Sequence, residues 1–221
     1  MKRGTEFADD SARDSPVRGF LHRPTSRSAA GLVLTHGAGS NCQSPLLVAL
    51  AEAFCAGGWM VLRCDLPFRQ ARPKGPPAGG AGERDQAGLR AAVAALRREN
   101  PGRVYLGGHS YGGRQASMLA AADPEVAEGL LLLSYPLHPP QRADVMRTGH
   151  LPNLRTPALF VQGTSDGFGS IAEMEEAIRL IPARTGLMAI PDAGHELMTR
   201  RNRGELAPEI RNRFQAFTSA M

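Results

Sequence analysis

The chain has 221 residues, of which 42% are hydrophobic, and this length accommodates one substantial domain with a well-buried core. Its formal net charge of +5 comes almost wholly from arginine, since Lys2 and Lys74 are the only lysines. No aromatic platform or recognition motif accompanies the dense basic cluster near the C-terminus, which favours a solvated helix face and excludes an evident nucleic-acid footprint. That cluster consists of Arg200, Arg201, Arg203, Arg211 and Arg213.

The first 15 residues carry charges of both signs and no periodic apolar pattern. They are expected to form a flexible N-terminal arm (1–15) ahead of a single domain (16–221). No signal-peptide core and no apolar run of membrane-spanning length occurs. Three cysteines, Cys42, Cys55 and Cys64, lack disulfide or zinc-site spacing. These observations predict a cytoplasmic protein with no membrane partner and no bound metal.

From Gly31 onward, short apolar runs alternate with amphipathic segments, which is typical of an α/β domain. The near-continuous hydrophobicity of the runs predicts parallel strands covered on both faces. With one or two antiparallel edge strands from the segment 17–22, a mostly parallel central sheet of about seven strands is expected. The runs are 32–34, 60–62, 104–106, 130–133, 159–161 and 187–190.

Amphipathic segments between these runs predict flanking helices. Ser44 is a candidate N-cap, with Pro45 at the first helical position and Gly57 and Gly58 at the end. Three further stripes of apolar residues have helical spacing and are expected to pack on the sheet. They are Leu89, Val93 and Leu96; Ile171, Met174, Ile178 and Ile181; and Leu206, Ile210, Phe214 and Phe217.

Two connections rich in proline and glycine, 65–82 and 136–157, are predicted to be irregular loops. The second is the usual place for a cap domain in this type of fold. About 20 residues are too few for a large cap. An open cleft is therefore expected.

The segment 106–113, LGGHSYGG, places Ser110 in a G-x-S-x-G motif between an apolar run and an alanine-rich helical segment. Glycines on either side allow a tight backbone turn, so this context predicts a nucleophile elbow. A serine hydroxyl is a weak nucleophile at neutral pH and needs a neighbouring base. The motif is short, so its flanks and partners must support the assignment.

His195 and Asp166 are the predicted partners of Ser110. Each of the three follows an apolar run, and they occur in the order Ser, Asp, His. The carboxyl ends of parallel strands meet at one edge of a sheet, so the three side chains are expected to converge there. Asp192 and Glu196 lie close to the histidine in sequence and remain alternatives to Asp166.

An acyl-transfer site also needs backbone N–H groups for the developing oxyanion. One is expected from Tyr111, the residue after the nucleophile. The second is expected from the loop HGAG at 36–39, with Ala38 or Gly37 as the donor. We assign Ala38 to the oxyanion hole and place Gly37 at the substrate site.

Other histidines and Cys42 have less distinct patterns. His36 is interpreted equally well as ordering the oxyanion loop or as an ordinary turn residue. His109 is expected to be a packing residue, and Cys42 a small buried hydrophobe. His138 could approach the mouth of the site and contact substrate, although a surface-loop histidine is the simpler interpretation.

These motifs together resemble the α/β-hydrolase superfamily. The closer resemblance is to its small, lidless, dienelactone-hydrolase-like group, related to the hydrolase-like domain of the third subunit of the NSL complex and its testis-expressed relative. The matching stretches are 34–41, 106–121, 132–140, 161–168 and 191–195. The resemblance implies a serine hydrolase without a cofactor. True dienelactone hydrolases have a cysteine where this chain has Ser110, so their substrate does not carry over.

Two functions follow from these features. The first is hydrolysis of a small-molecule carboxylic ester or related acyl bond by a Ser110, His195 and Asp166 triad. The second is a catalytically silent scaffold that keeps the fold and acts by binding. Intact candidate residues favour hydrolysis. The sequence determines neither the substrate nor the oligomeric state.

Overall fold

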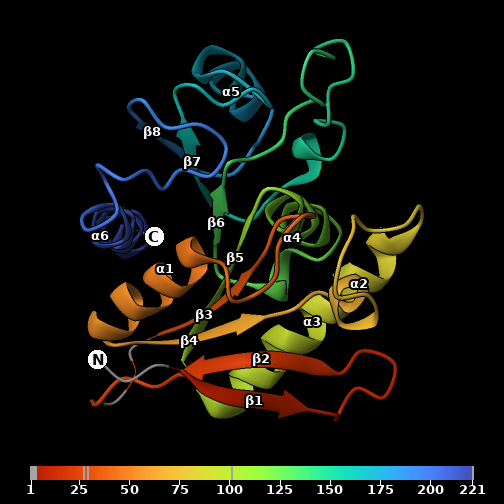
Figure 1. The fold of residues 1–221 in the computed structure, drawn as a ribbon, viewed down its shortest axis with the longest axis vertical. Helices are drawn as coiled ribbons and strands as arrows, with labels where there is room; N and C mark the ends of the chain where they lie inside the picture. Colours follow the sequence, from red (N-terminus) through yellow and green to blue (C-terminus); the bar gives the residue numbers. More distant parts are fainter. Residues whose placement is uncertain (1–3, 27, 29, 101, 221) are drawn as a thin grey trace.

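The computed structural model describes residues 4–26, 28, 30–100 and 102–220. An eight-stranded sheet forms its centre, in the order β1-β2-β4-β3-β5-β6-β7-β8 (Figure 1). β1 and β2 are antiparallel to their neighbours, and the remaining pairs are parallel. The strands are β1 (Thr5–Asp9), β2 (Val17–His22), β3 (Ala30–Thr35), β4 (Trp59–Cys64), β5 (Arg103–His109), β6 (Leu130–Leu133), β7 (Ala158–Gly163) and β8 (Thr185–Ile190).

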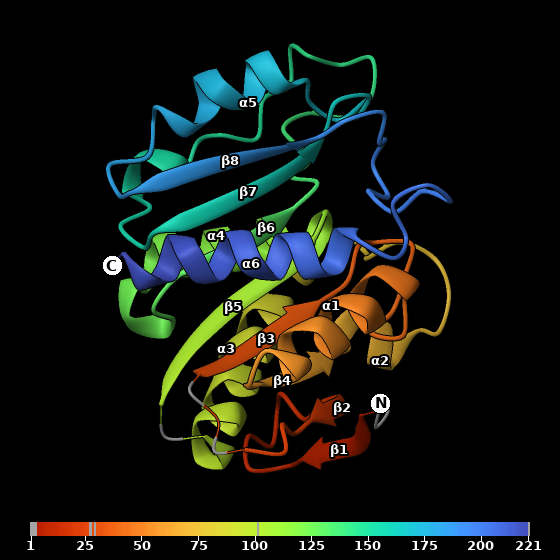
Figure 2. The same cartoon turned by 90° about the vertical axis from the view of Figure 1, so that its left-hand side faces the viewer.

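Helices cover both faces of this sheet, with α1 and α6 on one face and α3, α4 and α5 on the other (Figure 2). The two 3-10 helices, η1 and η2, are short. The bounds are α1 (Pro45–Ala56), α2 (Pro67–Ala71), α3 (Ala81–Glu99), α4 (Tyr111–Ala122), η1 (Pro124–Val126), η2 (Leu151–Asn153), α5 (Ile171–Ile178) and α6 (Leu206–Ser219).

Strand β6 shows why the sheet is buried on both sides. Leu130 and Leu132 belong to the core under α3 and α4, while Leu131 and Leu133 belong to the core under α1 and α6. Successive side chains of a strand point to opposite faces, so a run of four leucines serves both cores. The predicted parallel sheet, its flanking helices and the absence of a large cap are confirmed, with eight strands.

The predicted helix start at Ser44 is also confirmed. Its side chain accepts a hydrogen bond from Leu47 N at 3.5 Å, Pro45 is the first helical residue, and Gly57 caps the end of α1. An N-cap oxygen satisfies one of the free N–H groups at a helix start. The local sequence thus fixes the beginning of this helix.

The prediction of a flexible arm is wrong for Thr5–Asp9, which forms β1 at the edge of the sheet. Backbone pairing with β2 holds this segment, and such pairing requires no apolar period. Arg98 in α3 also donates to Asp9 at 2.5 Å and lowers the pKa of that carboxyl to about 2. The remaining calls on residues 1–3 lie outside the described residues.

The prediction of an irregular loop at 65–82 is wrong in part, because this connection contains α2 and the start of α3. Pro67 is the first residue of α2, a position where proline lacks only an N–H that would be unbonded anyway. Five residues are too few to show helical periodicity. By contrast, 136–157 contains only the short helix η2.

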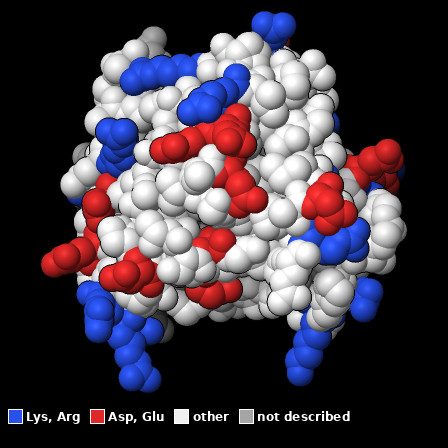
Figure 3. All heavy atoms as spheres, turned by 90° about the horizontal axis from the view of Figure 1, so that it is seen from above, with Lys and Arg blue, Asp and Glu red and all other residues white. Residues whose placement is uncertain are grey.

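The basic cluster near the C-terminus is only partly helical. Arg200, Arg201 and Arg203 lie in turns before α6, and Arg211 and Arg213 lie within it. On the side of the molecule that carries α5, carboxylates gather in the middle and basic side chains lie mostly towards the edges (Figure 3). The excess of arginine therefore forms no continuous basic surface on this face.

Candidate active site

Ser110 lies between the end of β5 and the start of α4, with φ 51° and ψ −116°. A positive φ is uncommon for a residue other than glycine and marks local strain. The turn is also tight, since a Cβ on Gly108 would lie 2.6 Å from backbone atoms of Gly112 and Gly113. This geometry matches the predicted elbow and holds the hydroxyl at the tip of the turn.

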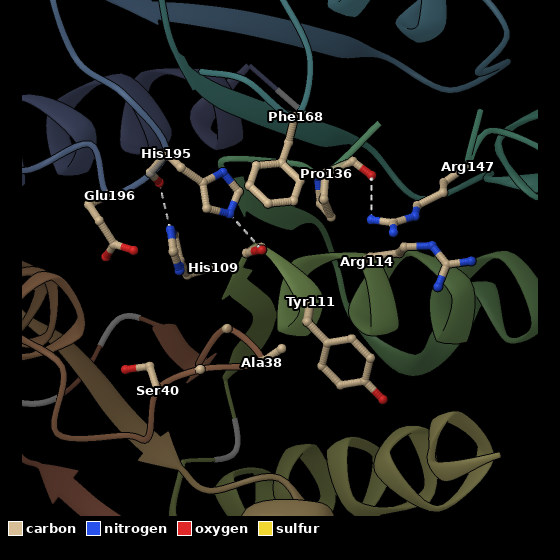
Figure 4. Close-up of a pocket in the computed structure, with 13 residues that line it drawn as sticks. Ala38, Ser40, His109, Tyr111, Arg114, Pro136, Arg147, Phe168, His195 and Glu196 are labelled. Atoms are coloured by element: carbon tan, nitrogen blue, oxygen red, sulfur yellow. Dashed lines mark hydrogen bonds between the residues drawn. The ribbon is translucent and has the colours of Figure 1, made fainter. Parts of the chain in front are cut away.

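His195 lies in the loop after β8, and its ring contacts Ser110. Its Nε2 is 2.8 Å from Ser110 Oγ and accepts a hydrogen bond from the hydroxyl (Figure 4). The loop is fixed from two sides, since its Ala193 carbonyl accepts from Ser165 N at 2.9 Å and the His195 carbonyl accepts from His109 Nε2 at 2.8 Å. The imidazole is thus oriented before any ligand binds.

Asp166, in the loop after β7, is the carboxylate that contacts His195. Its oxygens lie 2.9 and 3.0 Å from His195 Nδ1, which donates to them. Two further donors hold the carboxylate: Gln162 Nε2 at 3.0 Å and Phe168 N at 2.9 Å. The Asp166 side chain is fully buried. In this environment the hydrogen bonds fix the His195 tautomer with its proton on Nδ1.

The alternatives Asp192 and Glu196 are both exposed. Within the described residues, neither makes a hydrogen bond to the His195 ring. Asp192 has a φ of 58°, and its backbone N–H donates to Thr164 Oγ1 at 3.0 Å. The structure therefore places Asp166, and not these two residues, against His195.

The loop after β3 is held by a buried histidine. His36 Nδ1 donates to the Gly37 carbonyl at 2.9 Å, and its Nε2 accepts from Leu66 N at 3.1 Å. Burial lowers the pKa of His36, which agrees with a neutral ring. Ser40 N also donates to the Gly37 carbonyl, at 3.1 Å. The peptide bond between Gly37 and Ala38 is planar and trans, so its N–H points in the direction opposite to its carbonyl. Fixing the Gly37 carbonyl therefore also fixes the direction of the Ala38 N–H.

Arg69 in α2 fixes the next part of the same loop. Its guanidinium donates to the Ala38 carbonyl at 2.8 Å and to the Ser40 carbonyl at 2.7 Å. It also donates to the carbonyls of Arg72 and Gly75. The loop conformation is therefore set by two buried side chains, that of His36 at the start of the loop and that of Arg69 from α2.

Tyr111 has two separate environments. Its backbone begins α4 beside Ser110, while its hydroxyl donates to Asp85 Oδ2 in α3 at 2.6 Å. Asp85 also accepts from Phe68 N at 3.0 Å. Burial raises the pKa of both the Tyr111 hydroxyl and the Asp85 carboxyl. The Tyr111 side chain thus anchors α4 to α3.

A cavity of about 650 Å³ opens in front of Ser110. Gly37, Ala38 and Tyr111 are among the residues that line it. Its wall consists of Gly37, Ala38, Gly39, Ser40, His109, Ser110, Tyr111, Arg114, Pro136, Arg147, Phe168, His195 and Glu196.

His138, the other predicted substrate residue, does not line this cavity. It is buried, its Nδ1 donates to the Pro139 carbonyl at 2.8 Å, and its Nε2 lies 3.4 Å from Glu173. The interpretation as a surface-loop residue is wrong as well. The loop folds inward here, because His138 N donates to the Phe168 carbonyl at 3.2 Å.

Sequence reasoning missed several residues of the cavity wall, among them Arg114, Arg147 and Phe168. Arg114 lies one helical turn after Ser110, and this spacing is a signal that could have identified it. Phe168 stacks on His195 with ring centroids 4.2 Å apart. Phe168 and Arg147 lie in loops, where no periodicity indicates the direction of a side chain.

His109, which was expected to be a packing residue, instead donates a hydrogen bond to the His195 loop. Cys42 is buried as predicted, and burial raises its pKa to about 12.

A mostly parallel sheet with a strained serine at the β5–α4 turn, and with histidine and aspartate after later strands, defines the α/β-hydrolase class. Residues 28–220 match the family model described as an alpha/beta hydrolase domain. The chain belongs to this family.

Solved structures with the same fold cover nearly the whole chain. A dienelactone hydrolase from Anabaena variabilis has 23% identity and a TM-score of 0.75, covering 97% of this chain and 99% of that one. A lidless α/β serine hydrolase from Xanthomonas campestris has 18% identity and a TM-score of 0.74, covering 98% and 96%. Est1E from Butyrivibrio proteoclasticus, with bound ferulic acid, has 15% identity and a TM-score of 0.76, covering 93% and 97%.

One of these structures is a dienelactone hydrolase and another is a serine hydrolase without a lid, and their likeness to this chain shows the shared fold. The resemblance to the NSL-complex subunit stays a prediction. Among the described residues, no helix is long and apolar enough to cross a membrane.

Proposed function

We propose that this chain is a serine hydrolase that cleaves a carboxylic ester or related acyl bond through an acyl-enzyme intermediate. The observation that carries the proposal is the continuous hydrogen-bond chain from Ser110 Oγ to His195 and from His195 to Asp166, at 2.8 and 2.9 Å. These distances are within the range required for proton transfer between a nucleophile and its base.

In the acylation step, Ser110 Oγ attacks the substrate carbonyl carbon while His195 Nε2 takes the hydroxyl proton. The imidazole then carries a positive charge, which the buried Asp166 carboxylate stabilises across the bond from Nδ1. His195 next donates this proton to the leaving alcohol as the bond between the carbonyl carbon and that oxygen breaks. The acyl group remains as an ester on Ser110.

The negative charge on the carbonyl oxygen needs donors that are already in place. We assign them to the backbone N–H groups of Ala38 and Tyr111. Support for Ala38 comes from the bonds that His36 and Ser40 make to the preceding carbonyl of Gly37. Support for Tyr111 comes from its position as the first residue of α4, where N–H groups have no partner within the helix.

Deacylation repeats the same steps with water. His195 takes a proton from the water molecule, hydroxide attacks the acyl carbon, and the proton returns to Ser110 Oγ as the acid leaves. Residues of the chain perform every step of this scheme, and we propose no cofactor. The proposed substrate is a small molecule that enters the open cavity, whose lining includes Gly37.

Labelling with a fluorophosphonate probe tests this proposal directly. Wild type is expected to be labelled, while Ser110→Ala and His195→Ala are not. Ser165→Ala is a matched control, because Ser165 lies in the neighbouring loop after β7 and does not line the cavity. An unlabelled wild type, or equal labelling of wild type and Ser110→Ala, would contradict the proposal and leave a binding scaffold as the function.

The three cysteines are all unpaired, which supports our proposal of a reducing, cytoplasmic location. We propose no nucleic-acid or membrane partner. The mixed charges on the face in Figure 3 agree with this.

A further inference from the structure

Two arginines from different elements line the same end of the cavity. Arg114 is on α4, and its backbone N–H donates to the Ser110 carbonyl at 3.0 Å, so its side chain begins one turn beyond the nucleophile. Arg147 lies in the connection between β6 and β7. Its N–H donates to the Leu137 carbonyl at 2.7 Å, and its own carbonyl accepts from Tyr135 Oη at 3.1 Å. The backbone at both arginines is therefore held in place.

Neither guanidinium has a counter-charge. Arg114 Nε is buried without a hydrogen-bond partner, and the side chain of Arg147 has one long bond, 3.5 Å, to the Pro136 carbonyl. Within the described part of the chain, no carboxylate lies at ion-pair distance from either residue. Burial lowers the pKa of Arg147, and the charge of Arg114 lowers it further. Two half-buried cations that line one cavity without a paired carboxylate favour the binding of an anion there.

Other groups near the two arginines do not neutralise the pair. His150 bonds to Ser117 Oγ at 2.8 Å, and burial together with Arg114 lowers its pKa to about 4, so it is neutral at pH 7. Burial raises the pKa of Tyr135 to about 12, so its hydroxyl is also neutral. The acidic residue in the cavity wall, Glu196, lies on the opposite side of His195 from the two arginines (Figure 4).

We propose that Arg114 and Arg147 bind an anionic group, a carboxylate or a phosphate, at the far end of the acyl part of the substrate. This proposal rests on the proposed hydrolase function. His195 must give its proton to the leaving alcohol, so the leaving group departs on the side of His195. The acyl part then extends away from His195, towards the arginines. A planar guanidinium binds carboxylate and phosphate oxygens through paired N–H donors.

A pair of p-nitrophenyl esters tests this proposal. One is the half-ester of adipic acid, and the other ends in an isopropyl group in place of the carboxylate, which keeps the shape and removes the charge. Wild type is expected to prefer the charged ester. Arg114→Gln and Arg147→Gln are each expected to lower the ratio of kcat/KM for the charged ester to kcat/KM for the neutral ester by about tenfold. The double variant should abolish the preference.

Arg142→Gln is the matched control. Arg142 lies in the same connection as Arg147, but it is exposed and pairs with Asp144 at 3.1 Å. This variant should keep the wild-type preference, and thermal unfolding should verify that every variant is folded. No preference in wild type, or an equal loss in Arg142→Gln, would overturn the proposal.

A binding measurement separates this proposal from the hydrolase proposal. Ser110→Ala should bind the monomethyl ester of adipic acid in a calorimeter, and adding Arg147→Gln should weaken that binding by about tenfold. If wild type is not labelled by fluorophosphonate but this binding occurs, the anion site stands and the hydrolase proposal fails. If wild type is labelled and the binding is absent, the reverse holds. An ester ending in a phosphate distinguishes the two anions.

Discussion

Replacing Asp166 with asparagine would test how the triad is held. The carboxylate accepts hydrogen bonds from His195 Nδ1, Gln162 Nε2 and Phe168 N. An asparagine amide has one oxygen and one NH₂ group. In one orientation the asparagine NH₂ faces the Nε2 donor of Gln162, and in the other orientation it faces the backbone N–H of Phe168. One donor–donor contact in a fully buried position should lower the free energy of unfolding by about 1–3 kcal/mol.

The catalytic effect of Asp166→Asn should be larger than this loss of stability. When the amide donates to His195 Nδ1, the ring proton moves to Nε2, which can then no longer accept the Ser110 proton. We expect kcat to fall by about 10³–10⁴-fold, or roughly 4–5.5 kcal/mol in the barrier. Turnover of a p-nitrophenyl ester measures kcat, and urea unfolding measures stability.

Gln162→Met supplies the matched control for Asp166→Asn. It removes one donor to Asp166 Oδ2 and leaves the carboxylate beside His195. Its stability loss should be similar, at about 1–3 kcal/mol, while its kcat should fall by less than about tenfold. The reasoning is refuted if folded Asp166→Asn keeps kcat within about tenfold of wild type, or if Gln162→Met loses as much activity.

Three further changes test the surroundings of the site. Gly108→Ala brings a Cβ to 2.6 Å from Gly112 backbone, so it should destabilise the protein by about 1–3 kcal/mol or more; an unchanged calorimetric melting temperature would contradict this. Tyr111→Phe removes the 2.6 Å bond to Asp85, and urea unfolding should show a loss of about 1–3 kcal/mol; no loss would mean that this bond does not anchor α4. Burial lowers the pKa of His22 from 6.5 to about 4, so between these values only the unfolded chain binds the proton. Stability should therefore fall as pH falls through this window, by up to about 1.4 kcal/mol per pH unit; His22→Gln should weaken this dependence, and an identical slope would exclude His22 as its cause.

The sheet and the meeting of the three candidate residues could be predicted, because each strand and each residue has a local sequence signal and the topology of a parallel sheet brings the strand ends together. The four leucines 130–133 indicate a strand buried on both faces. Ser110, Asp166 and His195 each follow a strand, and parallel strands bring their carboxyl ends together. The sequence favoured Asp166 but left Asp192 and Glu196 as alternatives, because the final choice depends on loop geometry.

The parts that escaped prediction depend on partners that are distant in sequence. β1 has an exposed side-chain pattern, and its backbone bonds to β2 hold it. His138 turns inward because its loop meets the Phe168 loop, a contact across 30 residues. Periodicity and spacing contain no information about such pairs. Errors therefore concentrate in the loops, which are also the segments that form the wall of the cavity.

Two arginines, one from each of the proline- and glycine-rich connections, show how structure separates roles that sequence cannot. Arg69 is buried, and its donors reach four backbone carbonyls, so its charge is spread over fixed dipoles and its side chain has a structural role. Arg147 has one long bond to a carbonyl and faces Arg114. A satisfied guanidinium stabilises a loop without a ligand, whereas an unsatisfied one in a cavity gains most when an anion arrives. The same residue type thus braces the proposed oxyanion loop in one connection and selects the proposed substrate in the other.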